Sequence, residues 1–385
     1  MTRYRDRFDE MHAAAVAATG HDDFGDTRYE EGMRVLLDAL DDNPPGGAAA
    51  QASADGVISG ALSARLITQA GWNANPDYAS QPVERPLIVI GLPRTGTTAL
   101  HQLLSMDPQF QGFERWLTGN PMVRPPRDQW ETHPAYQACV QRIEAMRAMA
   151  PEIMAAHSTD ADEVDECLMP MAQSFVCNWF ASNIDVPQYD AWFRNADETP
   201  SFLRYREVLK LVGLNDARRW LLKNPSHVFG IDALLNAFPD ACIVQTHRHP
   251  AASMSSLMSL LGGIRELMTG EPVDRERLLA REAGFWAEGA RRSMAAAERL
   301  PDRFCHVRQE EIRQDPMKVI EKIYGHFGIP MSAEAEKRFQ AWAGNNPPDA
   351  RSSHSYRQVE RESIAPLFAD YIARFDLDQI VTAGA

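Results

Sequence analysis

The 385-residue sequence has only five cysteines, an odd number. The five are too few and too irregularly spaced for a disulfide framework, with no CxxC pair and no zinc-like spacing with histidine. A disulfide-stapled secreted domain and a structural zinc site are therefore not predicted. We expect reduced thiols in a cytosolic compartment, buried as small apolar residues. The cysteines are Cys139, Cys167, Cys177, Cys242 and Cys305.

Long apolar runs and basic blocks are also missing. No run of 18 apolar residues occurs, and the N-terminal stretch MTRYRDRFDEMH is charged, so the sequence predicts neither a membrane-spanning helix nor a secretory signal. The formal net charge of −14, without any Lys/Arg block, argues against a nucleic-acid partner. The sequence predicts a cytoplasmic protein without integral membrane contact, and peripheral membrane contact stays open.

What is present is typical of a globular protein, with 44% hydrophobic and 24% charged residues. Within residues 1–82, RYEEGMRVLLDALDD and SGALSARLITQAGW both place apolar residues at three- and four-residue spacing, separated by the breaker NPPGGAAAQ. We predict an N-terminal helical cap over residues 1–82.

The sequence pattern of residues 83–385 predicts an α/β domain with a parallel sheet flanked by helices. The short apolar runs PLIVIGL, RWLLK, ACIVQTHR and RFCHVRQ alternate with helical stretches such as SHVFGIDALLNAF and PMKVIEKIYGHFG. Between about 114 and 213 no strand pattern appears, and we interpret this part as a large helical insertion. Cap and domain are expected to form one compact unit.

A phosphate-binding loop is predicted where the first strand ends. Gly91-Leu-Pro-Arg-Thr-Gly-Thr-Thr98 follows a strand and opens a helix, so backbone N–H groups and the positive helix N-terminus would converge on one anion. A Walker A loop has lysine after its second glycine, and here Thr97 stands in its place. The cation is Arg94 instead. The alternative interpretation is a glycine turn without a ligand.

A second anion-binding segment is predicted at ACIVQTHRHPAASMSS. It places Arg248 at the end of a strand and Ser256 two turns into the following helix, where both can meet one phosphate. The alternative is a surface arginine followed by small serines that pack a helix.

Together these segments resemble the family of sulfotransferases that use 3′-phosphoadenosine 5′-phosphosulfate (PAPS). GLPRTGTT is similar to the family's 5′-phosphosulfate loop, and RHPAASMSS to its 3′-phosphate segment. WLLKNPSHVFGIDALLNAFPDA, HVRQEEIRQDP and SHSYRQVERESIAPLFADYIARF resemble its bacterial branch, so the resemblance covers most of the chain.

The resemblance implies PAPS as cosubstrate and no metal. The loop would hold the 5′-phosphate, Arg94 would offset charge on the bridging oxygen as the S–O bond breaks, and Arg248 with Ser256 would bind the 3′-phosphate. The donor-binding residues implied in this way are Arg94, Thr95, Gly96, Thr97, Thr98, Arg248, Ser256 and Arg351. Arg351 belongs, with His354 and Tyr356, to a C-terminal segment that would close over the nucleotide.

The acceptor must lose a proton as it attacks sulfur, so a general base is needed. His227 is our first candidate, because it follows a strand's carboxyl end and is similar in place to the family's catalytic histidine, with Lys223 near the transferring group. The histidine lies four residues after the lysine, however, and two in eukaryotic cytosolic members. Carboxylates serve as the base in other branches of the family, and the candidates here are Glu114, Glu163 and Glu166.

Two further departures concern the ligands. Gln309 stands where many family members have an aromatic residue near adenine. Methionines and aromatics of the insertion would suit an apolar alcohol or phenol, although a helical core explains them equally well. They are Trp116, Met169, Met171, Phe175, Trp179, Phe180, Trp192 and Phe193.

Three functions are compared on these grounds. The first is sulfuryl transfer from PAPS by in-line displacement to a hydroxyl, in preference to an amine, of a small acceptor whose apolar character stays open. The second is a P-loop kinase for small molecules, which the missing lysine and the lack of a Walker B acid disfavour. The third is a nucleotide-binding protein without catalysis. The family's short dimerisation segment has no match, and the oligomeric state is left open.

Overall fold

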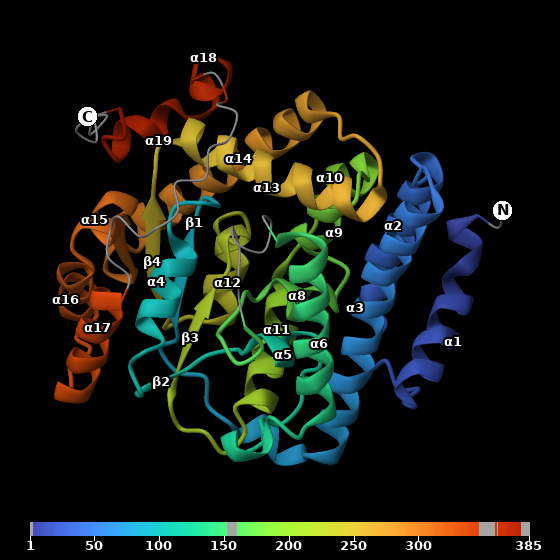
Figure 1. Ribbon diagram of the computed structural model, residues 1–385, viewed down its shortest axis with the longest axis horizontal. Helices are drawn as coiled ribbons and strands as arrows, with labels where there is room; N and C mark the ends of the chain where they lie inside the picture. The colour runs from blue at the N-terminus through green and yellow to red at the C-terminus, as the bar shows by residue number, and fades with distance from the viewer. Residues whose placement is uncertain (1–2, 152–159, 346–358, 360, 379–385) are drawn as a thin grey trace.

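The structure is a computed structural model, and it describes residues 3–151, 160–345, 359 and 361–378. Its centre is a sheet in which the strands of the described chain all run parallel, in the order β2-β3-β1-β4-β5 (Figure 1). The strands are β1 (Leu87–Gly91), β2 (Phe110–Gln111), β3 (Arg219–Lys223), β4 (Cys242–His247) and β5 (Phe304–Arg308). The predicted α/β fold with a parallel sheet is confirmed.

Successive residues of the central strand face opposite helical layers, as the strand geometry requires. Leu87 and Val89 of β1 pack in one apolar cluster with α4, α16 and α17, whereas Ile88 and Ile90 pack in the other with the insertion and the cap. All five residues of β1 are buried. A strand covered on both faces explains why its sequence is a continuous apolar run.

The helices before the sheet correspond to the predicted cap. They are α1 (Phe8–Thr19), α2 (Tyr29–Asp42) and α3 (Ala48–Ala74), and Figure 1 shows them in blue along one side of the molecule. α3 contacts α1, α11 and α13, and α2 contacts α10. Residues from the cap and from the sheet share one apolar cluster. The cap and the domain that begins at residue 83 therefore have a common core, and the boundary between them stays a prediction.

The stretch between β2 and β3 is mainly helical, apart from an isolated bridge between Glu114 and Val164. Its helices in the described chain are α5 (Arg115–Thr118), α6 (Pro134–Met149), α8 (Leu168–Ala172), α9 (Asn178–Asn183), α10 (Pro187–Phe193) and α11 (Thr199–Val212). Strand β2 was not predicted, because a strand of two residues is too short to show an alternation of apolar and polar side chains.

The remaining helices flank the sheet and continue to the C-terminal part. They are α4 (Thr97–Leu104), α12 (Ile231–Ala237), α13 (Pro250–Thr269), α14 (Arg275–Arg299), α15 (Gln309–Gln314), α16 (Pro316–Phe327), α17 (Ala333–Asn345), α18 (Arg361–Ile364) and α19 (Ala369–Arg374). Short 3-10 turns are η1 (Tyr4–Arg7), η2 (Pro76–Ser80), η3 (Arg127–Gln129), η4 (Pro225–Val228), η5 (Pro301–Arg303) and η7 (Ala365–Phe368).

The cysteines and the lengths of the helices can be compared with what the composition predicts. All five cysteines are free and buried, as predicted. Within the described ranges, no helix combines the length and the apolar character that crossing a membrane would need.

A buried arginine joins the cap to the insertion. The Arg65 side chain is 1% exposed, and its guanidinium donates hydrogen bonds to the carbonyl oxygens of Phe24 (2.7 Å) and Gln173 (3.1 Å). It also lies over the ring of Tyr29, with 4.1 Å between the guanidinium carbon and the ring centroid. Desolvation lowers the pKa of Arg65, because burial disfavours its charged form. These carbonyl groups would be left buried and unpaired without it.

We predict that Arg65→Met lowers the free energy of unfolding by about 3 kcal/mol, because several charge-assisted hydrogen bonds are lost together. Urea unfolding followed by circular dichroism measures this. The matched control is Arg28→Met, since Arg28 is exposed and pairs with Asp26 at the surface, where such pairs contribute little. An equal effect of both substitutions would contradict a special role for Arg65.

Candidate active site

The loop after β1 has the backbone of an anion cradle. Arg94 and Gly96 adopt left-handed conformations, with φ of 64° and 92°. Gly91 has φ of 146°, and a Cβ added to it would lie 2.5 Å from Oγ1 of Thr246 on the neighbouring strand β4. Glycine is required here by both the conformation and the close approach. The chain then enters α4, whose first N–H groups have no partner within the helix and point toward the loop.

The loop threonines have different tasks. The Thr95 hydroxyl is fully buried, donates to the carbonyl oxygen of Leu92 (2.6 Å) and shares a 2.5 Å hydrogen bond with the Thr246 hydroxyl. It therefore braces the turn against β4. Thr97 and Thr98 are the first residues of α4 and follow Gly96, which is the N-cap. Their backbone N–H groups are the ones available to an anion.

The two predicted phosphate segments meet in the structure. β1 and β4 are neighbours, with Gly91 opposite Thr246, so the loop and Arg248 lie at the same edge of the sheet. The Arg94 Nε donates to the Ser256 Oγ at 3.0 Å, and an Arg248 Nη donates to the Arg94 carbonyl oxygen at 3.1 Å. Gln309 also donates to that carbonyl, at 3.4 Å. Arg248, Ser256 and Gln309, which follow Arg94 by at least 154 positions in the sequence, thus surround one turn.

A lysine and a carboxylate face the same loop from the other side. Lys223 ends β3, is 1% exposed, and its Nζ donates to Glu166 Oε1 at 2.7 Å and to Thr98 Oγ1 at 3.3 Å. The backbone keeps them together, because the Cys167 N–H donates to the Lys223 carbonyl oxygen at 3.0 Å. The Glu166 side chain remains 23% exposed. A carboxylate with access to solvent therefore stands beside the start of α4.

The structure places His227 in an apolar surrounding. Its ring lies 5.2 Å from the ring of Phe202 and 6.4 Å from that of Tyr205, centroid to centroid. It is 1% exposed, and among the described residues its Nε2 has no hydrogen-bond partner. Burial lowers the pKa of His227 to about 3. A base that is enclosed in this way is poorly placed to meet an acceptor hydroxyl.

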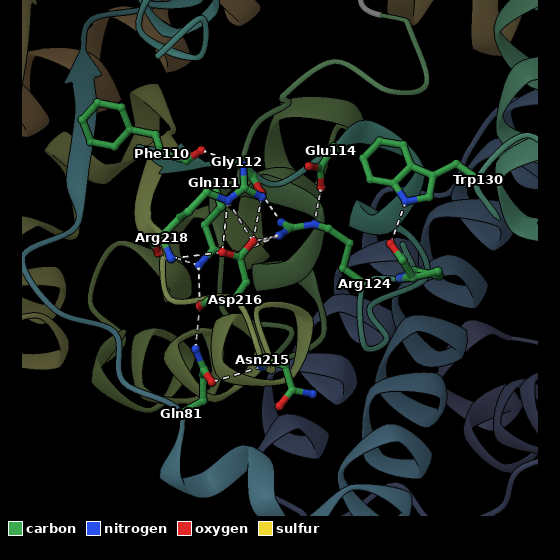
Figure 2. A network of polar contacts seen from close by, with 11 residues as sticks. Gln81, Phe110, Gln111, Gly112, Glu114, Arg124, Trp130, Asn215, Asp216 and Arg218 are labelled. Carbon is green, nitrogen blue, oxygen red and sulfur yellow. Dashed lines mark hydrogen bonds and ion pairs between the residues drawn. The ribbon is translucent and has the colours of Figure 1, made fainter. Parts of the chain in front are cut away.

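Glu114 belongs to a polar network at another place (Figure 2). Its carboxylate accepts from the Arg124 Nε at 3.0 Å, and Arg124 also donates to Gln111 (2.9 Å) and Asp216 (3.2 Å). Asp216 and Arg218, which also pair with each other, directly precede β3. The network thus extends to the amino end of a strand, whereas the phosphate loop follows a carboxyl end. Burial raises the pKa of Glu114, and Arg124 opposes this rise.

The remaining predicted positions are Glu163 and Arg351. The Glu163 carboxylate accepts from the Asp160 backbone N–H (2.9 Å) and from Gln102 of α4 (3.4 Å). Arg351, together with His354 and Tyr356, lies outside the described residues.

Known proteins with similar sequences identify the family. The model of the family described as "Sulfotransferase family" matches residues 86–333, well over half of the chain. The chain belongs to the sulfotransferase family. This identification confirms the resemblance that the loop and the Arg248 segment carry, and the protein is a transferase.

Solved structures and a curated relative support the same assignment. Sulfotransferase STF1 of Mycobacterium tuberculosis is 35% identical, with a TM-score of 0.86 over 96% of this chain and 100% of that one. Sulfotransferase STF9 of Mycobacterium avium is 28% identical, also with a TM-score of 0.86, over 96% and 97%. The omega-hydroxy-beta-dihydromenaquinone-9 sulfotransferase Stf3 of Mycobacterium bovis is 23% identical over 76% of each chain.

Sequence reasoning missed a cluster next to the sulfotransferase's Arg248 segment. His247, the last residue of β4, is hydrogen-bonded through Nδ1 to Tyr371 (2.9 Å) and through Nε2 to His306 of β5 (2.9 Å). Phe375 stacks on the His247 ring, with centroids 3.7 Å apart. The C-terminal helix α19 is thereby fastened to the strand that carries Arg248. A local signal was absent, since Tyr371 is 124 residues away in the sequence.

The insertion's apolar side chains named above, with the exception of Met169, belong to the core of this sulfotransferase or pack against it. The buried ones pack in the large apolar cluster, and Trp179 and Trp192 pack against it. The helical-core interpretation is therefore confirmed for them. The fully buried members are Trp116, Met171, Phe175, Phe180 and Phe193.

The low pKa of His227 predicts loss of stability in acid. Between the ordinary pKa of about 6.5 and the folded-state value of about 3, the unfolded chain binds a proton that the folded chain does not. Stability from this residue is therefore full above pH 6.5 and falls as the pH decreases. We predict that His227→Leu reduces the drop in unfolding free energy between pH 7 and 5 by about 2 kcal/mol. Urea titrations at both pH values measure it, and an unchanged drop would contradict the prediction.

Proposed function

We propose that this sulfotransferase transfers the sulfuryl group of PAPS to a hydroxyl group of an apolar acceptor. The observation that carries the proposal is the contact of two anion-binding segments at one turn, where Arg94 reaches Ser256 and Arg248 reaches the Arg94 carbonyl. A donor with phosphates at two places on one ribose requires cations and hydroxyls at two neighbouring places. The loop and the Arg248 segment would supply them.

Each phosphate has its own set of partners in this proposal. The backbone N–H groups of Gly96, Thr97 and Thr98 would hold the 5′-phosphate, as helix N-termini hold anions. Arg248 and Ser256 would hold the 3′-phosphate, with Arg94 between the two. PAPS supplies an activated sulfuryl group, bonded to a phosphate that can leave.

We propose Glu166 as the general base, in place of His227. Glu166 is partly exposed and lies beside Lys223, whose Nζ also contacts Thr98 of the loop. His227 is enclosed by aromatic rings, and Glu114 is held by Arg124 in a network toward the other end of the sheet. Among the carboxylates considered, Glu166 thus combines access with nearness to the donor loop. A base must first satisfy this geometric condition.

The proposed reaction balances as a direct displacement. The acceptor oxygen forms a bond to sulfur while the bond between sulfur and the phosphate oxygen breaks, and the acceptor proton passes to Glu166. The negative charge moves to the departing phosphate. The Lys223 ammonium, between Glu166 and Thr98, is placed to stabilise charge on the transferring group.

An apolar hydroxyl compound is the acceptor class that we propose. The curated Stf3 relative is named for a hydroxylated menaquinone derivative, which is such a compound. Phenols and aliphatic alcohols are both included, since Glu166 would remove a proton from either.

Calorimetric titration of the wild type with adenosine 3′,5′-bisphosphate tests the donor. We expect metal-independent binding, and a rise in Kd of about 100-fold in Arg248→Ala because charge-assisted contacts to the 3′-phosphate are lost. Adenosine 5′-monophosphate is the control ligand, since it lacks the 3′-phosphate and should bind both proteins nearly equally. A preference for ATP with Mg²⁺ would overturn the proposal in favour of a kinase.

Glu166→Gln tests the base. We expect kcat for sulfuryl transfer from labelled PAPS to 2-naphthol or 1-decanol to fall about 10²- to 10⁴-fold, with the Kd of the bisphosphate nearly unchanged. The matched controls are Glu163→Gln, which removes a carboxylate from the same segment, and His227→Asn. Both should retain activity within a few-fold. If His227→Asn lost activity and Glu166→Gln kept it, the base would be His227.

A further inference from the structure

A cavity of about 590 Å³ lies apart from the proposed donor site. It is bounded by the α2–α3 connection, the end of α9, α10, and the facing ends of α13 and α14. Its volume is within the range of about 300–1,000 Å³ that is typical of ligand sites. Arg265 in its wall follows Ser256 by nine residues of α13, which is about 14 Å along a helix. The cavity is thus separated from the loop and from Arg248.

Much of the cavity wall is apolar. The apolar side chains come from the α2–α3 connection, α3, the α9–α10 region and α14, so a ligand's hydrocarbon part would be enclosed on several sides, whereas α13 contributes the polar Arg265 and Thr269. The main apolar lining residues are Pro44, Ala54, Ile184, Val186, Pro187 and Leu278.

Among the described residues, Arg265 is the arginine of this wall that makes no ion pair within 4.0 Å. It is 9% exposed, and it donates hydrogen bonds through Nε to the Ser182 carbonyl oxygen (3.0 Å) and through one Nη to that of Ala181 (2.7 Å). Within the described part of the chain, no carboxylate lies within 4.0 Å of its guanidinium, and its other Nη makes no hydrogen bond. Burial lowers the pKa of Arg265. The carboxylates of Glu282 and Asp185 act on Arg265 from beyond contact distance and oppose this fall without reversing it, so an anion in the cavity would stabilise the buried charge further.

The other arginines of the wall are already neutralised. Arg281 pairs with Asp190 at 2.6 Å, Arg194 with the same carboxylate at 2.8 Å, and Arg277 with Asp185 at 3.3 Å. These pairs leave Arg265 as the arginine available to an anionic group. The carboxylates of Glu271 and Asp274 also line the cavity, so an anionic group fits where it contacts Arg265 directly.

We propose that this cavity binds a small amphipathic anion, whose carboxylate or sulfate group pairs with Arg265 and whose hydrocarbon part fills the apolar wall. This site is distinct from the donor site and does not depend on the proposed reaction. Carboxylates and sulfate esters share the chemistry that it recognises.

Thermal unfolding with three eight-carbon probes tests the proposal. At equal concentration, sodium octanoate or sodium octyl sulfate should raise the Tm by about 2 °C, and neutral 1-octanol should not. The comparison between octanoate and octyl sulfate distinguishes the two head groups. The shift should persist when adenosine 3′,5′-bisphosphate is saturating, because the sites are separate.

Variants locate the probe. Arg265→Met should abolish the shift, and Arg265→Lys should retain part of it. Ala191→Trp fills the cavity from an exposed position on α10, so it should abolish the shift even if Arg265→Met fails to fold. Arg291→Met is the matched control, since Arg291 is exposed and lies outside this wall, and it should respond as the wild type does. An equal shift with 1-octanol, a shift that survives Ala191→Trp, or loss of the shift with the bisphosphate would overturn the proposal.

Discussion

The close pairing of β1 with β4 is the constraint on which the site depends. Gly91 lies opposite Thr246, and a side chain at Gly91 would collide with the Thr246 hydroxyl. Because the strands end together, the turn that follows β1 emerges next to Arg248. The Thr95 hydroxyl then ties the turn to Thr246, and Arg248 donates to a carbonyl of the same turn. Two segments that are far apart in the sequence are thus held as one surface by backbone pairing, before any ligand contributes.

In the proposed mechanism, the position of each ion pair along the sheet decides whether it takes part in the reaction or supports the fold. Lys223 and Glu166 lie at the carboxyl end of β3, where loops and helix N-termini leave room for a ligand. Arg124 and Glu114 are equally well paired, but their network reaches the residues that precede β3. A buried pair that lacks access to a ligand holds the edge of the sheet in place, since removing either partner would leave a charge without compensation. The same residue types therefore serve different purposes, according to the strand end that they occupy.

The sequence predicts what local patterns determine. The continuous apolar runs at β1, β3, β4 and β5 indicate strands, because a strand that is covered on both faces is apolar throughout. The anion loop and the Arg248 segment are recognisable for a similar reason, since each is a strand end followed by a helix start. The general base, by contrast, could not be chosen from local sequence patterns. Tertiary packing decides that His227 faces Phe202 and not solvent. It also decides that Glu166 contacts Lys223, which is 57 residues away in the sequence. A single sequence does not show such packing.

The lysine missing from the loop has a physical explanation in this arrangement. In a Walker A loop one lysine extends along a linear chain of phosphates. Here the loop cation Arg94 donates a hydrogen bond to Ser256. The start of α4 has no lysine of its own, and Lys223 of the adjacent strand β3 contacts Thr98 instead. Positive charge thus comes from two directions around one turn and not along a line. The proposed donor, whose anionic groups diverge from one ribose, would match such a distribution better than a triphosphate would, and the Glu166 carboxylate lies next to the second cation. The loop's departure from the Walker pattern and the position of the proposed base are therefore consequences of the same geometry.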